Sequence, residues 1–157
     1  MKNILFVCTG NSCRSVMAEG FFKKLTEDRT QDFIVGSAGI SAVEGFVATD
    51  ETIRVMKEEG VDVSGHQSRR LSYEMVRKAD KIFVMEEMHR DMILRLVPEA
   101  EPKVLLLTEF SSDHQEGEGR RDIPDPIRMS DNFYMNVAQF IRDCVENVIK
   151  SLREDEK

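Results

Sequence analysis

Residues 3–15 read Asn-Ile-Leu-Phe-Val-Cys-Thr-Gly-Asn-Ser-Cys-Arg-Ser, and this stretch decides how the fold is interpreted. The apolar run Ile4–Val7 predicts a short buried strand that ends in a glycine-containing loop. From Ser15 to about Leu25, apolar residues recur at a spacing of four, which predicts a helix. The stretch therefore predicts a strand, a tight loop and a helix in direct succession.

The same alternation continues along the rest of the chain. Further strands are predicted at Phe33–Val35, Lys81–Met85 and Val104–Leu107, and helices at Ala48–Glu59, Ser72–Lys78, Met88–Leu96 and Phe133–Leu152. Strands that alternate with helices form right-handed crossovers and a parallel sheet covered on both faces, so we expect an α/β fold. No linker or repeat interrupts the 157 residues, and we expect a single three-layer domain, 1–157.

Composition limits the class of protein. The chain is 41% hydrophobic and carries 22 basic against 29 acidic residues, a net charge of −7. This charge argues against nucleic acid and anionic membranes as partners. No apolar run approaches the roughly 18 residues of a membrane helix, and Ile4–Val7 is too short for a secretion signal. Three cysteines do not make a disulfide framework, so we expect a reducing cytoplasmic location. The polar segment 113–121 is expected to be a mobile loop.

The loop after the first predicted strand has the composition of an anion site. Ligands of parallel sheets bind at the carboxyl ends of strands, which is where Cys8–Arg14 falls. The amides of a tight loop and of a helix N-terminus converge into a cradle for an anion. Gly10 and Asn11 tolerate the positive φ that such a loop requires. A cysteine at Cys8 in this environment is stabilised as a thiolate nucleophile.

Two further side chains complete a reaction scheme. Arg14 carries a planar fork of donors that fits two phosphate oxygens, and Ser15 can donate its hydroxyl to the thiolate or cap the helix. Attack on a phosphomonoester also needs an acid for the leaving oxygen. Asp125 is the candidate, because prolines on both sides hold it in a rigid loop. The spacing of Cys8 and Arg14 with this later aspartate predicts cysteine-dependent phosphatase chemistry.

These motifs resemble those of the low-molecular-weight protein tyrosine phosphatase family, which includes bacterial protein arginine phosphatases. The likeness covers nearly the whole chain and rests on residues 8–15, Ser37-Ala-Gly, His66–Leu71 and Asp125-Pro126. The resemblance implies a four-stranded parallel sheet in the order 2-1-3-4 with helices on both faces. It also implies a phosphorylated protein as substrate, a phosphocysteine intermediate, and neither metal nor cofactor.

The resemblance also assigns roles by position. It makes Cys8 the nucleophile, Arg14 the phosphate clamp and Asp125 the general acid. The phosphate or another oxyanion would be held by the loop residues Thr9, Gly10, Asn11, Ser12, Cys13, Arg14 and Ser15. Asn11 would hold the loop's shape through Ser37 and His66, and Cys13 would be able to form a disulfide with the nucleophile on oxidation. Cys144 falls on the apolar stripe of the last helix and is expected to be a core residue.

The sequence leaves the substrate open. Position 12 is a bulky aliphatic in tyrosine-specific members and threonine in arginine phosphatases; here it is Ser12. The aromatic pocket walls of tyrosine-specific members are replaced by Val43 and Ile127-Arg128, for which Phe46, Phe133 or Tyr134 are possible substitutes. Phosphotyrosine is our main interpretation and phosphoarginine the alternative. An arsenate reductase with a cysteine relay is disfavoured, because residues 85–98 contain no cysteine. A redox switch based on Cys8 and Cys13 is a third hypothesis.

Overall fold

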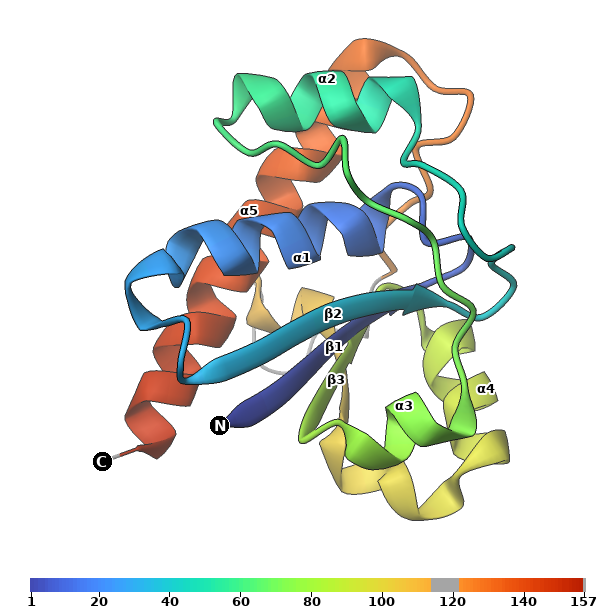
Figure 1. Cartoon of the computed structure of the whole chain (residues 1–157), viewed down its shortest axis with the longest axis vertical. Helices are drawn as coiled ribbons and strands as arrows, with labels where there is room; N and C mark the ends of the chain where they lie inside the picture. The colour runs from blue at the N-terminus through green and yellow to red at the C-terminus, as the bar shows by residue number, and fades with distance from the viewer. Residues whose placement is uncertain (114–121, 157) are drawn as a thin grey trace.

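The computed structural model describes residues 1–113 and 122–156 and has an α/β fold with a four-stranded parallel sheet at its centre (Figure 1). The strands are β1 (Lys2–Cys8), β2 (Phe33–Gly39), β3 (Lys81–Val84) and β4 (Val104–Leu106). Their order is β2-β1-β3-β4, which confirms the order that the family resemblance implies. Of the expected mobile loop 113–121, residues 114–121 lie outside the described residues.

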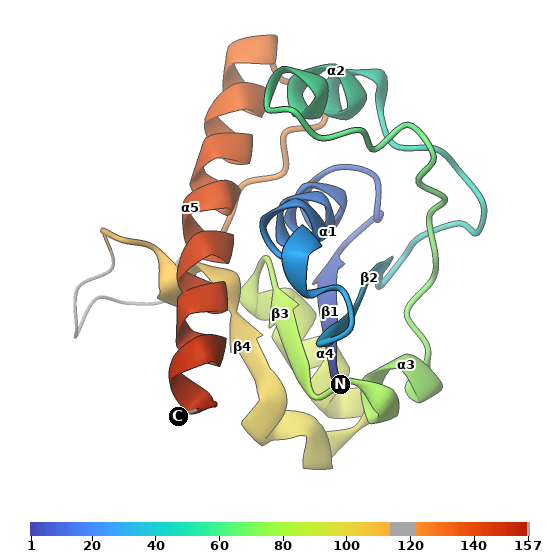
Figure 2. The same cartoon turned by 60° about the vertical axis from the view of Figure 1, so that its left-hand side comes forward.

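The main helices cover both faces of the sheet. They are α1 (Arg14–Leu25), α2 (Asp50–Glu58), α3 (Tyr73–Lys78), α4 (Glu87–Leu96) and α5 (Asp131–Asp155). Short 3₁₀ turns occupy Glu27–Arg29, Pro98–Lys103 and Leu107–Phe110. In Figure 2, α1, α2 and α5 lie on one side of the sheet and α3 and α4 on the other. Among the described residues, no helix is long and apolar enough to cross a membrane.

Local chemistry explains where the helices begin. The hydroxyls of Thr49, Ser72 and Ser130 each accept a hydrogen bond from a backbone amide in the first turn of α2, α3 and α5. Cys13 occupies the same position before α1, but its side chain makes no capping hydrogen bond. The first amides of α1 therefore remain available to a ligand at the end of β1.

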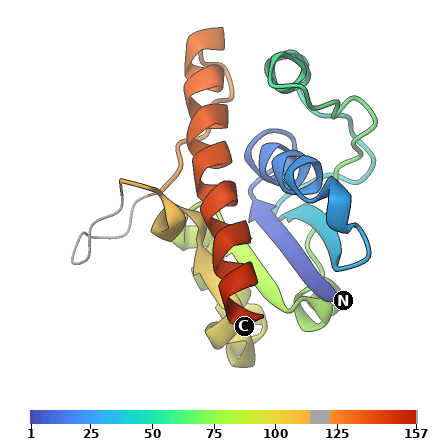
Figure 3. The same cartoon turned by 90° about the vertical axis from the view of Figure 1, so that its left-hand side faces the viewer.

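Two hydrophobic clusters hold the layers together. The larger joins Phe6 of β1 and Phe21 of α1 to Ile141 of α5, and Figure 3 shows α5 running alongside the sheet. The smaller cluster lies on the opposite face, where Val84 of β3 packs with Ile93 of α4. Aromatic rings connect the central strands, since Phe6 stacks on a phenylalanine of β3. The core thus fixes β1 between β2 and β3, and the loop after β1 lies where the strand order changes direction.

Candidate active site

Cys8 is the last residue of β1, and its thiol is surrounded by groups of the following loop. Its side chain is buried, and the Sγ atom lies 2.9 Å from Ser15 Oγ. The backbone amide of Asn11 points at the same sulfur at 3.3 Å. The sheet and α1 therefore place a buried sulfur between a hydroxyl and an amide, at the N-terminus of a helix.

Asn11 fixes the direction of the hydrogen bonds around the sulfur. Its backbone has a φ of 54°, the left-handed conformation predicted for this tight loop. Its Oδ1 accepts from the backbone amide of Arg69 at 2.9 Å, so Nδ2 must be the donor to Ser15 Oγ at 2.8 Å and to Ser37 Oγ at 2.9 Å. Because Ser15 accepts from Asn11, its own hydroxyl proton is free to donate to Cys8 Sγ.

Residues beyond the loop support Asn11. Ser37 Oγ donates to a carboxylate oxygen of Glu19, which fixes the Ser37 hydroxyl as an acceptor for Asn11 Nδ2. His66 Nε2 lies 2.9 Å from the carbonyl oxygen of Asn11 and donates to it. The structure thus brings Ser37 and His66 into contact with Asn11, as expected from the family resemblance. The participation of Glu19 was not predicted.

Gly39 allows the loop to approach the sheet closely. It is the last residue of β2 and pairs with Cys8 of β1. A methyl group added at Gly39 would lie 2.5 Å from the carbonyl oxygen of Thr9 and 2.8 Å from the amide nitrogen of Asn11. Any side chain here would push the loop away, so the close approach of the loop requires glycine at this position of the Ser-Ala-Gly motif.

Arg14 is held rigidly although it carries a charge. Its side chain is 2% exposed, and Nη1 donates to Glu86 Oε2 at 2.7 Å and to the carbonyl oxygen of Ile123 at 2.6 Å. The Nη2 atom lies on the side of Asp125, 3.8 Å from its Oδ2 atom. The guanidinium is therefore oriented by groups on two other loops before any substrate binds.

The two aspartates of the segment 122–125, Asp122 and Asp125, have different environments. Asp125 is exposed, and its Oδ1 accepts from the amide of Ile127 at 3.0 Å while Oδ2 faces Arg14. Asp122 instead accepts a hydrogen bond from the amide of Glu87 at 2.8 Å, so its carboxylate is bonded to the first residue of α4. The geometry therefore brings Asp125, and not Asp122, beside the guanidinium of the loop.

Sequence reasoning missed His89, a fully buried residue in the first turn of α4. The amide of Glu86 donates to His89 Nδ1 at 3.1 Å, so the ring proton sits on Nε2 and points to Thr9 Oγ1 at 2.9 Å. Burial, together with the positive charge of Arg14, lowers the pKa of His89 to about 4. The sequence contained one indication of its role: Glu86 and His89 come shortly after β3, at the carboxyl end of the sheet, where ligands bind.

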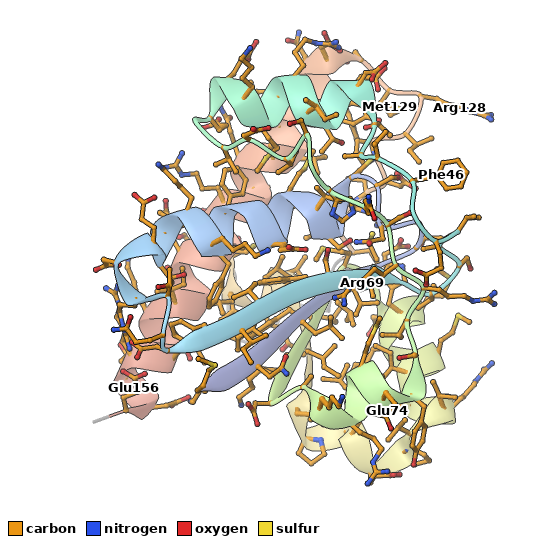
Figure 4. All side chains as sticks on the ribbon, in the orientation of Figure 1. Phe46, Arg69, Glu74, Arg128, Met129 and Glu156 are labelled. Carbon is orange, nitrogen blue, oxygen red and sulfur yellow. The ribbon has the colours of Figure 1, made fainter. Side chains whose placement is uncertain are left out.

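The remaining candidate residues are Cys13 and the three aromatic residues proposed as substitutes for the pocket walls. Cys13 is buried, with its Sγ atom 3.5 Å from Thr49 Oγ1 and 3.7 Å from Tyr134 Oη. Tyr134 is therefore part of the interior and not a pocket wall, because α5 turns this side chain toward α1 and the loop. Phe133 is half-buried against the larger cluster. Of the three proposed aromatic substitutes, only Phe46 is exposed, and Figure 4 shows it projecting from the same edge as Arg128 and Met129.

The chain is similar to known proteins over nearly its whole length. Residues 3–157 match the family model described as low molecular weight phosphotyrosine protein phosphatase. The low molecular weight protein-tyrosine-phosphatase Ptp of Acinetobacter johnsonii is 34% identical, over 96% of this chain and 98% of its own. A protein-arginine-phosphatase of Geobacillus stearothermophilus is 36% identical, over 96% and 93%. A protein tyrosine phosphatase from Entamoeba histolytica, solved with Hepes in its active site, has a TM-score of 0.90 at 28% identity, and the match covers 100% of both chains.

Proposed function

Because the chain belongs to the low molecular weight phosphotyrosine protein phosphatase family, we propose that it hydrolyses phosphotyrosine in proteins through a phosphocysteine intermediate on Cys8. The observation that carries this proposal is the position of the Cys8 sulfur, 2.9 Å from Ser15 Oγ and 3.3 Å from the Asn11 amide, in a loop that ends at a buried Arg14. A sulfur held among donors is stabilised as a thiolate, which is the nucleophilic form of cysteine.

In the first step, the Cys8 thiolate attacks phosphorus. A bond forms between Sγ and phosphorus as the bond from phosphorus to the tyrosine oxygen breaks. Loop amides, the uncapped N-terminus of α1 and the guanidinium of Arg14 stabilise the charge on the phosphoryl oxygens. Glu86 and the Ile123 carbonyl hold that guanidinium in advance, so little reorganisation is required during the reaction.

Asp125 acts as the general acid in the first step and as the general base in the second. In its protonated form it gives a proton to the leaving tyrosine oxygen, which departs as a neutral phenol. The resulting carboxylate then takes a proton from a water molecule whose oxygen attacks phosphorus. The bond from sulfur to phosphorus breaks, inorganic phosphate leaves, and the Cys8 thiolate and the protonated Asp125 are restored.

Phosphotyrosine is favoured over phosphoarginine as the substrate. The family model that matches residues 3–157 carries phosphotyrosine in its description, although arginine phosphatases are among the relatives. The residue that raised the alternative, Ser12, is half-buried, and its Oγ atom lies 3.7 Å from Cys13 Sγ. Among the described residues, Cys13 Sγ is the hydrogen-bond partner of this hydroxyl, and it does not distinguish a phosphoramidate from a phosphate ester. We also propose a reducing cytoplasmic compartment, because turnover needs Cys8 as a free thiol and the structure contains three free cysteines.

Replacement of the nucleophile tests the central proposal. We expect Cys8→Ser to lower kcat/KM for p-nitrophenyl phosphate by roughly 10⁴-fold, because a hydroxyl in this position is a much weaker nucleophile than a thiolate. Cys144→Ala is the matched control, since Cys144 is buried in the core and should leave turnover near the wild-type value. Residual activity within tenfold of the wild type in Cys8→Ser would contradict the assignment.

The substrate class is tested by measuring kcat/KM for two peptides that differ only at the phosphorylated residue, which is phosphotyrosine in one and phosphoarginine in the other. We expect the wild-type protein to hydrolyse the phosphotyrosine peptide with the higher kcat/KM. The reverse order would transfer the proposal to phosphoarginine while leaving the role of Cys8 intact.

The choice of acid is tested by the leaving group. We expect Asp125→Ala to slow a phosphotyrosine peptide by about 10²–10⁴-fold, and p-nitrophenyl phosphate much less, because nitrophenolate leaves without a proton. Asp122→Ala is the matched control, because this carboxylate bonds to the Glu87 amide at the start of α4. If Asp122→Ala shows the leaving-group dependence and Asp125→Ala does not, the assignment of the acid is wrong.

A further inference from the structure

The central sheet has an open edge at β2. The strand order places β2 outermost, and β1 is its neighbour on the inner side. Among the described residues, the bridge from Gly39 to Arg70 is the one strand contact on its outer side. Before that bridge, no strand lies beside the outer edge of β2 in the described part of the chain. Backbone amides and carbonyls along such an edge can pair with another extended chain.

The hydrogen bonds at the end of β2 show which backbone groups face outward. The amide of Ile40 donates to the carbonyl of Cys8, so even-numbered residues direct their backbone groups toward β1. The amide of Gly39 donates instead to the carbonyl of Arg69, on the outer side. The backbone groups of the odd-numbered residues of β2, Val35 among them, therefore face away from β1 and are available to an incoming chain.

A hollow lies on each side of this edge. On the side of α1, a hollow of about 460 Å³ is enclosed by β2, α1 and residues 62–69. On the side of α3, a second hollow of about 440 Å³ lies between β2 and α3. Val35, Gly36 and Arg69 line both, and Figure 1 shows α1 and α3 on opposite sides of β2. Successive side chains of a strand point to opposite faces, so a chain paired with β2 would place alternate side chains in the two hollows.

Arg69 provides a fixed positive charge between the two hollows. Its Nε and Nη2 atoms donate to the outward carbonyl of Ser37 at 3.3 and 3.2 Å, which holds the guanidinium beside β2 (Figure 4). The two lysines that line the hollows are each paired with a glutamate of their own helix. Among the described residues, Arg69 has no such carboxylate partner. An acidic side chain on the incoming chain would supply one.

The α3 side of the edge combines this charge with apolar surface. A methyl group added at Gly36 would lie 2.7 Å from Arg69 Nη2, so the guanidinium occupies the space beside that glycine. Two residues earlier on the same face of β2, Ile34 is 53% exposed and lines the hollow together with Met75. The carboxylate of Asp62 lies on the other side, in the hollow next to α1. The α3 side therefore matches an apolar and an acidic residue two positions apart on the incoming strand.

We propose that the outer edge of β2 binds an extended segment of a partner protein as an added strand, with an apolar and an acidic residue directed to the α3 side. We call this surface the edge groove and define it as Val35, Gly36 and Arg69 with the two adjoining hollows. It is separate from the candidate active site, because Cys8 and Arg14 line neither hollow.

A single extended segment fits the edge groove better than a second copy of the chain does. The edge of β2 is recessed, since residues 62–69 and α1 enclose a hollow along it. In a second copy the same segments would flank its own β2, so the two recessed edges could not approach to the roughly 4.8 Å that strand pairing requires. A segment without such flanking structure can enter the groove.

The probe is a fluorescein-labelled peptide with a central valine, a glutamate two positions away on each side, and threonine elsewhere. This symmetric pattern presents the apolar and acidic residues in either strand direction. We expect saturable binding by fluorescence anisotropy. Methylation of the central backbone nitrogens should weaken binding by at least about tenfold, because it removes donors of the added strand. Replacement of both glutamates by glutamine should weaken it about threefold to tenfold.

Val35→Pro is the decisive variant. Its amide faces outward, so proline removes a donor that β1 does not use, and edge strands tolerate proline at such positions. We expect at least about tenfold weaker peptide binding. Val35→Ala is the matched control, because it shortens the same side chain but keeps the amide, and its affinity should stay within about threefold of the wild type. Thermal unfolding verifies that both variants are folded.

Arg69→Gln tests the charge separately from the backbone pairing. In this variant the glutamate and glutamine peptides should bind with equal affinity, because the cation that distinguishes them is gone. This comparison and the methylated peptide decide the matter if Val35→Pro does not fold.

Four outcomes would overturn the edge groove. The first is the absence of saturable binding to the wild-type protein. The second is equal affinity of the methylated and unmodified peptides, or wild-type affinity in folded Val35→Pro. The third is displacement of the peptide by inorganic phosphate, which would place it at the catalytic loop. The fourth is a wild-type dimer in sedimentation that Val35→Pro dissociates, which would assign the edge to a second copy of the chain.

Discussion

His89 is a buried imidazole whose proton position is set by its neighbours. The Glu86 amide occupies Nδ1, so Nε2 donates to Thr9 Oγ1. Among the described residues, His89 is the side chain that bonds to this hydroxyl, which directly follows Cys8. As a neutral donor, His89 therefore orients a side chain of the catalytic loop without placing a second positive charge beside Arg14.

This environment predicts a pH dependence of stability. The folded pKa of His89 is about 4, whereas the unfolded value is near 6.5, so the unfolded chain binds a proton first as the pH falls. Stability attributable to neutral His89 is complete above about pH 6.5 and is lost progressively down to about pH 4, by roughly 3 kcal/mol. We expect His89→Gln to lose less stability than the wild type over this range, as measured by urea unfolding.

The comparison with the variant is necessary because other charged groups surround His89. Arg14, Glu86, Asp122 and Asp125 all act electrostatically on the imidazole. Their contribution is shared by both proteins, so the difference between the two curves belongs to His89. Parallel curves from pH 6.5 to pH 4 would mean that His89 is protonated with equal ease in the folded and unfolded chain.

At the scale of residues, the sequence was most informative where chemistry is local. Cys8 and Arg14 were identifiable because one short segment contains the strand end, the loop and the helix start. The contacts of Asn11 with Ser37 and His66 came from family resemblance, because they link positions 26 and 55 residues away. Glu86 and His89 were missed, since a glutamate and a histidine at the start of a helix have many uses without the loop they contact.

At the scale of elements, α4 organises the catalytic loop from outside. Glu86, immediately before the helix, bonds to Arg14, and His89 in its first turn bonds to Thr9. The two ends of the loop are therefore held by one turn of one helix. This arrangement requires β1 and β3 to be neighbours, because α4 follows β3 directly.

Element positions were predictable where hydrophobic patterns are strong and less so elsewhere. The long stripe from Phe133 to Leu152 predicted α5, and the helix predicted at Ser72–Lys78 corresponds to α3, with Ser72 as its cap. The second strand was predicted to end at Val35 but continues to Gly39. Its last four residues, 36–39, are small, and at Gly39 the catalytic loop approaches too closely for any side chain, so the segment lacks the bulky apolar signature of a strand.

At the scale of the whole molecule, the chain's two ends share one core. Phe6 of β1, Phe21 of α1 and Ile141 of α5 belong to the same cluster, although they come from opposite ends of the sequence. Arg29, after α1, also bonds to both carboxylate oxygens of Glu156. The active-site loop lies between these segments, since Cys13 before α1 approaches Tyr134 of α5.

This shared core predicts that the chain unfolds in one cooperative step. The chain has no tryptophan and two tyrosines, of which Tyr134 is buried beside Cys13 and Tyr73 is exposed on α3. In Tyr73→Phe, tyrosine fluorescence therefore reports on the contact between α5 and the catalytic loop, while far-ultraviolet circular dichroism reports on all helices and strands. We expect the two urea transitions to coincide, because α5 cannot leave α1 without exposing the larger cluster. A fluorescence transition at lower urea would show that the active-site end opens independently, and residues 1–157 would then not behave as a single domain.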